Sequence, residues 1–91
     1  MTSTFHALTL HEVALRCGVE LRFVEQLVEI GIIEGHPQDA AAYSGEVTLR
    51  VQRCVRLQSD LGVNLEGAAV IVELLERIEA LEHELRGLRR T

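Results

Sequence analysis

Along residues 64–88, apolar residues recur at alternating spacings of three and four. This is a heptad pattern, in which a narrow apolar stripe packs against a partner helix. The first half, from Ala68 to Leu75, is apolar on nearly all sides, so we expect its own domain to enclose it. The second half is polar outside the stripe, so we expect it to project and pair with a second copy. The predicted dimerisation residues are Ile71, Leu74, Ile78, Leu81, Leu85 and Leu88.

Charged residues flank this stripe and leave the direction of helix pairing open. In a parallel pair, Arg77 of one helix would lie near Glu82 of the other, with complementary charge. Within a single helix, Glu82 also lies four residues before Arg86, and such pairs contribute only about 0.2–0.5 kcal/mol each. A stripe of fewer than three heptads is short for an isolated coiled coil, so we expect the domains to brace it.

The N-terminal third of the chain shows the signals of two short helices. Thr9 and Glu12 form a capping box, which predicts a helix that begins at this point and ends at Gly18. A second helix is expected from about Glu20 to Gly31. Two short helices joined by a tight glycine turn make a helix-turn-helix.

The second predicted helix is amphipathic. One face is apolar and is expected to be buried, and it carries Leu21, Val24, Leu27 and Val28. The opposite face is polar and is expected to be exposed. Its residues are Arg22, Glu25, Gln26 and Glu29.

A loop rich in helix breakers follows at about residues 34–44, with a short extended piece expected near 41–43. Ser44 is expected to cap a third helix over about 45–61, and Asn64 is expected to cap the long helix over about 64–89. The third helix should bury Val47, Val51, Cys54, Val55 and Leu61. With the helix-turn-helix at about 9–33, residues 1–91 are predicted to form a single all-α domain.

Composition agrees with a small helical protein. The chain of 91 residues is 47% hydrophobic but has only two phenylalanines, one tyrosine and one proline. Its net charge is −5, and residues 1–46 account for all of it, with two arginines against seven acidic residues. An acidic surface repels the phosphates of a nucleic-acid backbone and attracts a basic protein partner.

The sequence offers no candidate for catalysis, for a metal or for a cofactor. Cys17 and Cys54 lack the close spacing of a zinc or redox site and are expected to be buried thiols. The four histidines are scattered, and no nucleotide-binding or hydrolase motif occurs. Because no catalytic motif occurs, we expect that the protein is not an enzyme. No signal peptide or membrane-spanning run is found, so we expect the protein to be cytoplasmic.

The order of elements resembles the MerR-type winged helix-turn-helix, and most closely the CbpM family of chaperone modulators. The resemblance rests on LTLHEVALRCGVELRFVEQLVEIGII at residues 8–33 and RLQSDLGVNLEGAAVIVELLERIEALEHEL at 56–85. It implies a homodimer, with antiparallel long helices as in MerR-type proteins. It also implies binding to the J-domain of a CbpA- or DnaJ-like co-chaperone, with inhibition of the work of that co-chaperone with Hsp70.

The chain departs from the DNA-binding relatives where they contact DNA. MerR-type regulators carry Arg-Tyr-Tyr in the second helix, where this chain has Glu25, Gln26 and Leu27. The loop at 34–44, which corresponds to their wing, has no arginine or lysine. The polar face of the second helix sets Arg22 against Glu25 and Glu29, a balance of −1. We therefore do not expect DNA binding.

The J-domain has a basic second helix, so the resemblance suggests an acidic surface as its contact. We predict that the partner-binding residues are Glu20, Arg22, Glu25, Gln26 and Glu29. An ordinary solvated helix face accounts for the same residues. Two further alternatives stay open: a scaffold or antitoxin-like dimer with another protein partner, and a MerR-type transcriptional regulator. The regulator would need a basic stripe from Arg50, Arg53 and Arg56, which we instead expect to form ion pairs between helices of the dimer.

Overall fold

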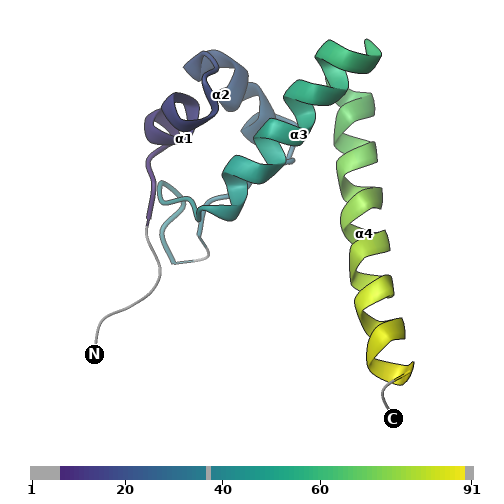
Figure 1. Ribbon diagram of the computed structural model, residues 1–91. Coiled ribbons are helices and arrows are strands. Elements are labelled where there is room, and N and C mark those ends of the chain that lie inside the picture. The colour runs from purple at the N-terminus through teal and green to yellow at the C-terminus, as the bar shows by residue number, and fades with distance from the viewer. Residues whose placement is uncertain (1–6, 37, 90–91) are drawn as a thin grey trace.

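The computed structural model describes residues 7–36 and 38–89. Two short helices pack on one side of a central helix, and a long helix returns along its other side (Figure 1). The described residues contain no strand, and the predicted all-α class, a helix-turn-helix followed by a long C-terminal helix, is confirmed. The elements are α1 (Leu10–Cys17), α2 (Leu21–Glu29), α3 (Glu46–Leu61) and α4 (Leu65–Arg89).

The start of α1 has the predicted capping box. The Thr9 hydroxyl oxygen accepts a hydrogen bond from the Glu12 backbone N–H at 3.1 Å, and the Thr9 N–H donates to Glu12 Oε1 at 2.8 Å. The helix ends at Gly18, whose left-handed backbone (φ 67°) lets its N–H reach the carbonyls of Ala14 and Leu15. This turn directs α2 back across α1, as the helix-turn-helix requires.

The other two predicted helix caps have different outcomes. Asn64 caps α4, because its Oδ1 accepts a hydrogen bond from the Gly67 N–H at 2.7 Å. The expectation for Ser44 is wrong: α3 begins after Gly45, and no side chain caps it. The first turn of α3 is instead supported by the Thr48 hydroxyl, which donates to the Gly45 carbonyl at 2.6 Å.

The core extends from the helix-turn-helix through α3 to the first turns of α4. Two residues expected inside are exposed, Leu21 (37%) and Leu61 (69%). Both lie at helix ends beside a turn, where no neighbouring element covers them. The largest fully buried side chains are Val13, Val24, Leu27, Ile33, Val51, Cys54 and Val72.

The loop between α2 and α3 is anchored where it enters α3. Leu8 and Tyr43 form an antiparallel bridge, with two backbone hydrogen bonds of 2.8 Å that join the entry of α1 to the entry of α3. Within the loop, Gly35 passes so close to the Ala40 carbonyl that a Cβ at this position would overlap it. Among the described residues, the wing-like segment is thus a pair of isolated bridges and not a β-hairpin.

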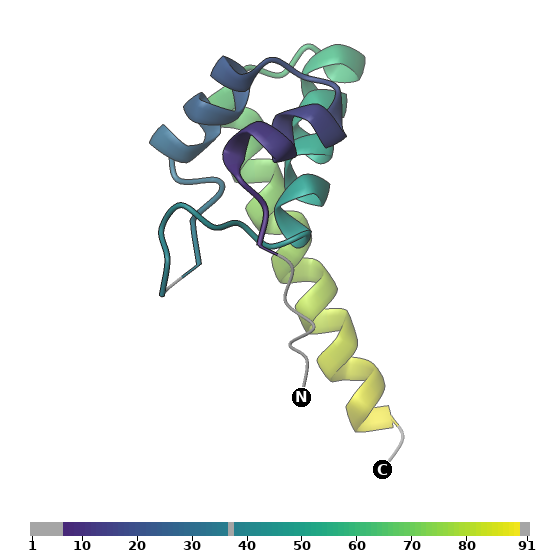
Figure 2. The ribbon, with the colours of Figure 1, turned by 90° about the vertical axis from the view of Figure 1, so that its left-hand side faces the viewer.

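Helix α4 is enclosed less than its sequence pattern indicates. Only Ala68 and Val72 are buried, and Val70 is 56% exposed, so the expected enclosure of the first half holds for one side alone. The C-terminal half extends beyond the other three helices (Figure 2). Within the described ranges, no helix combines the length and the apolar character needed to cross a membrane.

The capping box gives a first testable prediction. Replacing Thr9 with alanine should lower the free energy of unfolding by about 1 kcal/mol, because the Glu12 N–H loses its acceptor. Urea denaturation followed by circular dichroism measures this change. Ser59→Ala is the matched control, since the Ser59 hydroxyl donates only to the Val55 carbonyl one turn back in the same helix. Equal losses in the two variants would contradict the capping role.

Candidate partner-binding surfaces

Four of the five predicted partner-binding residues lie together on the solvent face of α2. They line a shallow hollow of about 290 Å³, whose apolar lining comes from Leu10 of α1 and Val28 of α2. The carboxylates of Glu25 and Glu29 have no hydrogen-bond or ion-pair partner among the described residues. They are therefore available to a basic partner. We call this surface the α2 hollow, and its polar residues are Arg22, Glu25, Gln26 and Glu29.

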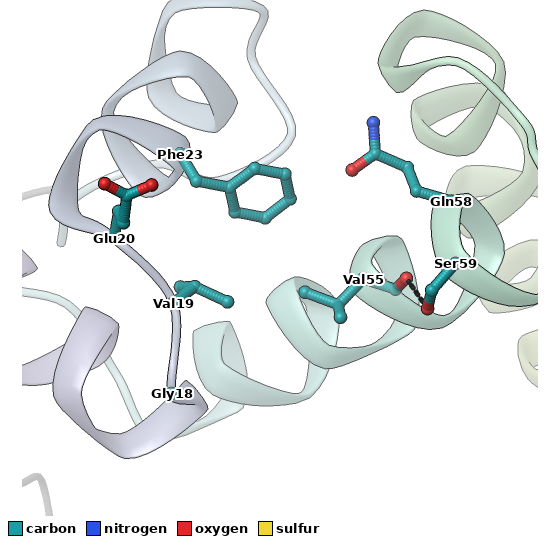
Figure 3. A pocket seen from close by; sticks show the side chains of 7 residues that line it. All are labelled: Gly18, Val19, Glu20, Phe23, Val55, Gln58 and Ser59. Atoms are coloured by element: carbon teal, nitrogen blue, oxygen red, sulfur yellow. Dashed lines mark hydrogen bonds between the residues drawn. The ribbon is translucent and has the colours of Figure 1, made fainter.

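The fifth residue, Glu20, lies on a different surface. As the N-cap of α2, it borders a cleft of about 480 Å³ between the helix-turn-helix turn and the C-terminal half of α3. We call this the elbow cleft (Figure 3). Residues of α2 are spaced by about 100°, so Phe23 in the cleft points roughly opposite to Glu25 in the hollow. One partner helix lying along α2 therefore cannot contact the carboxylate of Glu20 in the cleft and that of Glu25 in the hollow at the same time.

The elbow cleft was missed by the sequence analysis. Its apolar part consists of Val19 and Phe23, which face Val55 of α3 across the opening (Figure 3). Gln58 and Ser59 form the far edge, where the Ser59 hydroxyl is already bonded to the Val55 carbonyl at 2.7 Å. The sequence signal for it was an aromatic residue, Phe23, placed shortly after the tight turn at Gly18.

Two ion pairs join α3 to α4. Arg50 donates two hydrogen bonds to Glu76, from Nε to Oε2 at 2.6 Å and from Nη2 to Oε1 at 2.5 Å. Its third donor, Nη1, bonds to the Ile32 carbonyl at 2.6 Å. One turn further along α3, Arg53 Nη2 bonds to Glu79 Oε2 at 2.6 Å.

The ion pairs shift the pKa of their members. The hydrogen bonds to Glu76 and Glu79 raise the pKa of the Arg50 and Arg53 guanidinium groups, so both remain charged. The hydrogen bond from Arg53 lowers the pKa of the Glu79 carboxyl below that of a free glutamate. Ion pairs between helices were predicted for the dimer. Arg50 and Arg53 do form ion pairs between two helices, but both helices belong to the same chain.

These pairs also change the charge available for contacting nucleic acid. Of the three arginines in the basic stripe that the sequence suggested, Arg50 and Arg53 each face a glutamate of α4. Only Arg56 is exposed without an ion-pair partner in the described part of the chain. One uncompensated arginine is a poor basis for the phosphate contacts that DNA binding requires.

The predicted dimerisation residues form an exposed stripe on α4. Ile71 is half-buried, and the exposed fractions of the other five range from 49% to 72%. At about 100° per residue, most of the stripe lies on a different side of α4 from Ala68 and Val72, which belong to the core. Val70 extends the exposed apolar stripe toward the start of the helix. The domain itself thus leaves the stripe uncovered.

The two cysteines are both free thiols. Cys54 is fully buried, and Cys17 is half-buried with its sulfur 3.6 Å from the Thr48 carbonyl. Burial raises the pKa of both thiols, which keeps them protonated. In the described ranges, no three side chains of metal-ligating type gather in one place.

Comparison with known proteins agrees with this geometry. The family model described as MerR HTH family regulatory protein matches residues 8–90, which makes the chain a MerR-type helix-turn-helix protein. The chaperone modulatory proteins CbpM of Salmonella arizonae, Salmonella paratyphi B and Salmonella newport are each 33% identical to it over 90 residues. Each match covers 97% of this chain and 86% of the relative. The chain therefore belongs to the CbpM family.

The lowered pKa of Glu79 predicts an acid-sensitive link between α3 and α4. A carboxyl whose pKa is lower in the folded protein stabilises it fully above the unfolded pKa, and this contribution is lost as pH falls through the folded value. Wild type and Glu79→Gln should therefore differ in free energy of unfolding at about pH 7 and converge at about pH 3. Urea denaturation across this range measures the difference.

The matched control for this titration is Glu73→Gln, on the same helix. Glu73 is exposed and has no ion-pair partner among the described residues. Its variant should show no comparable dependence on pH. A difference between wild type and Glu79→Gln that persisted unchanged in acid would contradict the role of the Arg53–Glu79 pair.

Proposed function

We propose that this chain is a non-enzymatic chaperone modulator of the cytoplasm. It binds the J-domain of a CbpA- or DnaJ-like co-chaperone and inhibits the work of that co-chaperone with Hsp70. The observation that carries the proposal is the α2 hollow, which presents uncompensated carboxylates where a DNA-binding helix-turn-helix needs positive charge. Membership of the CbpM family supports it, because the curated relatives are named as chaperone modulatory proteins.

The chemistry of the α2 hollow suits a basic helix. Glu25 and Glu29 lie one turn apart on α2, so they can pair with basic residues one turn apart on a partner helix. Leu10 and Val28 also line the hollow, and together they offer a small apolar surface for the stems of long basic side chains. Such a charged contact favours rapid association that weakens as salt is added.

A transcriptional regulator remains the second function class, and the surface charges do not favour it. Its best source of phosphate contacts was the arginine stripe on α3, of which Arg50 and Arg53 are neutralised by Glu76 and Glu79. A duplex would also meet Glu25 and Glu29 on the helix that normally enters the major groove. The energetic cost of placing carboxylates against phosphates argues for a protein partner.

Titration calorimetry against the J-domain of the host co-chaperone tests the proposal. The wild-type protein should bind with a Kd that is micromolar or tighter, about −8 kcal/mol or better. Glu25→Lys with Glu29→Lys should weaken binding by at least about tenfold, because two attractive contacts become repulsive. Far-ultraviolet circular dichroism should be unchanged, since both residues are exposed.

Two control variants locate the contact. Glu66→Lys with Glu73→Lys makes the same change in net charge on α4 and should leave the affinity unaltered. Glu20→Lys tests the elbow cleft: a loss of affinity in this variant alone would move the contact from the α2 hollow to that cleft. Absence of binding by wild type, with the J-domain shown to be folded, would overturn the proposal, and a shift of duplex DNA at low salt would support the regulator.

We also propose that the chain is a homodimer, paired through the exposed stripe of α4. The stripe faces away from the core of its own chain, and it carries five large apolar side chains that are about half exposed or more. Burying each of these side chains stabilises a dimer by about 1.5–3 kcal/mol at most. Kinship with MerR-type proteins favours an antiparallel pair, which places the two helix-turn-helix units at opposite ends.

The dimer has its own test. Replacing Ile78 and Leu81 with aspartate should give a monomer in analytical ultracentrifugation at concentrations where wild type is a dimer, because four carboxylates would enter the middle of the interface. Ala80→Asp is the matched control, since Ala80 is exposed on another side of the same turn. A monomeric wild type, or a dimer that survives both aspartates, would contradict the proposed interface.

A further inference from the structure

The core holds only the first turns of α4. Its buried residues, Ala68 and Val72, join the same core cluster as Val51 and Cys54 of α3. Beyond Val72, no side chain of α4 is buried in the described structure. From the turn at Gly62 the two helices diverge (Figure 1), so apolar packing alone does not determine the direction of the rest of α4.

Charged side chains span the space between the two helices where the core ends. Beside the ion pairs is a trough of about 580 Å³, lined by Arg50 and Arg53 from α3 and by Glu76 and Glu79 from α4. The arginines are three residues apart on α3, and their glutamates are three residues apart on α4. Because α3 and α4 run in opposite directions from the turn at Gly62 (Figure 1), the two cross-links cross each other, and bending or rotation of α4 lengthens at least one of them.

Arg50 does more than join two helices. Besides its two bonds to Glu76, it donates to the carbonyl of Ile32, which lies just after α2. Its side chain is 39% exposed and that of Glu76 is 31% exposed, so solvent screens the pair only in part. A planar guanidinium fixed at three points holds its geometry better than a single surface contact does. Arg50 therefore connects the segment just after α2, the N-terminal part of α3 and the middle of α4.

We propose that Arg50 and Arg53 are positioning residues that fix the direction in which α4 leaves the helix-turn-helix unit. In the proposed dimer, the direction of α4 sets the distance and the angle between the two α2 hollows. This second statement rests on the proposed function, whereas the first concerns the single chain. Because the link is ionic and partly exposed, high salt loosens it.

Residual dipolar couplings of backbone amides test the direction of α4 without any partner. In wild type at low salt, one alignment tensor should fit residues of α1, α2, α3 and α4 together. In Glu76→Gln with Glu79→Gln, the couplings of α4 beyond Val72 should depart from that fit or shrink in magnitude. Glu66→Gln with Glu73→Gln removes the same charge from the same helix without breaking an ion pair to α3, so its couplings should match wild type.

Charge reversal separates the two arginines. Arg53→Glu with Glu79→Arg should restore the wild-type couplings, because neither side chain of this pair makes a hydrogen bond to any other described residue. Arg50→Glu with Glu76→Arg should not restore them, since a carboxylate at position 50 cannot donate to the Ile32 carbonyl. Titrating wild type with salt should reproduce the effect of the Gln variants without any substitution.

Unchanged couplings in the double Gln variant, or in wild type at high salt, would overturn the positioning role. That result leaves the proposed function untouched, because the contact residues Glu25 and Glu29 are present in every one of these variants. Conversely, failure of wild type to bind a J-domain says nothing about the direction of α4. The two proposals therefore stand or fall on separate measurements.

Discussion

Burial of α3 on two sides is the constraint from which the rest of the structure follows. Val47, Val51 and Cys54 are spaced by four and three residues, so they form one continuous face along the helix. α1 covers part of this face, and the start of α4 packs on α3 from the other side. Small residues such as Ala14, Cys54 and Ala68 are buried in this core. In a domain of this size, losing either contact would leave too small a core.

The same central position of α3 separates the two proposed interaction surfaces. α2 and the free part of α4 lie on opposite sides of α3 (Figure 1), so a partner on one does not obstruct a partner on the other. The stripe on α4 also faces away from the core, which leaves it accessible to a second copy. A dimer formed in this way would keep both α2 hollows exposed to solvent. Oligomerisation and partner binding are thus compatible within 91 residues.

The electrostatics show how a DNA-reading scaffold can support another function. The helix-turn-helix geometry depends on a capping box, a glycine turn and a buried face, and none of these requires positive charge. The exposed face of α2 is therefore able to change sign without affecting the fold. On α3, Arg50 and Arg53 point toward α4, where they pair with Glu76 and Glu79. Their charge supports the architecture and is compensated by the two glutamates.

The sequence by itself determined the features that depend on neighbours in the chain. The Thr9–Glu12 capping box, the cap at Asn64, the four helices and the stripe on α4 all follow from spacings of three or four residues, which place side chains on one helix face whatever lies around them. Tertiary structure decided the rest. It separated Glu20 from Glu25, gave Arg50 its partners Glu76 and Ile32, and left Leu61 uncovered. These outcomes depend on how helices cross and where they end, and such contacts join residues far apart in the chain that no local pattern records.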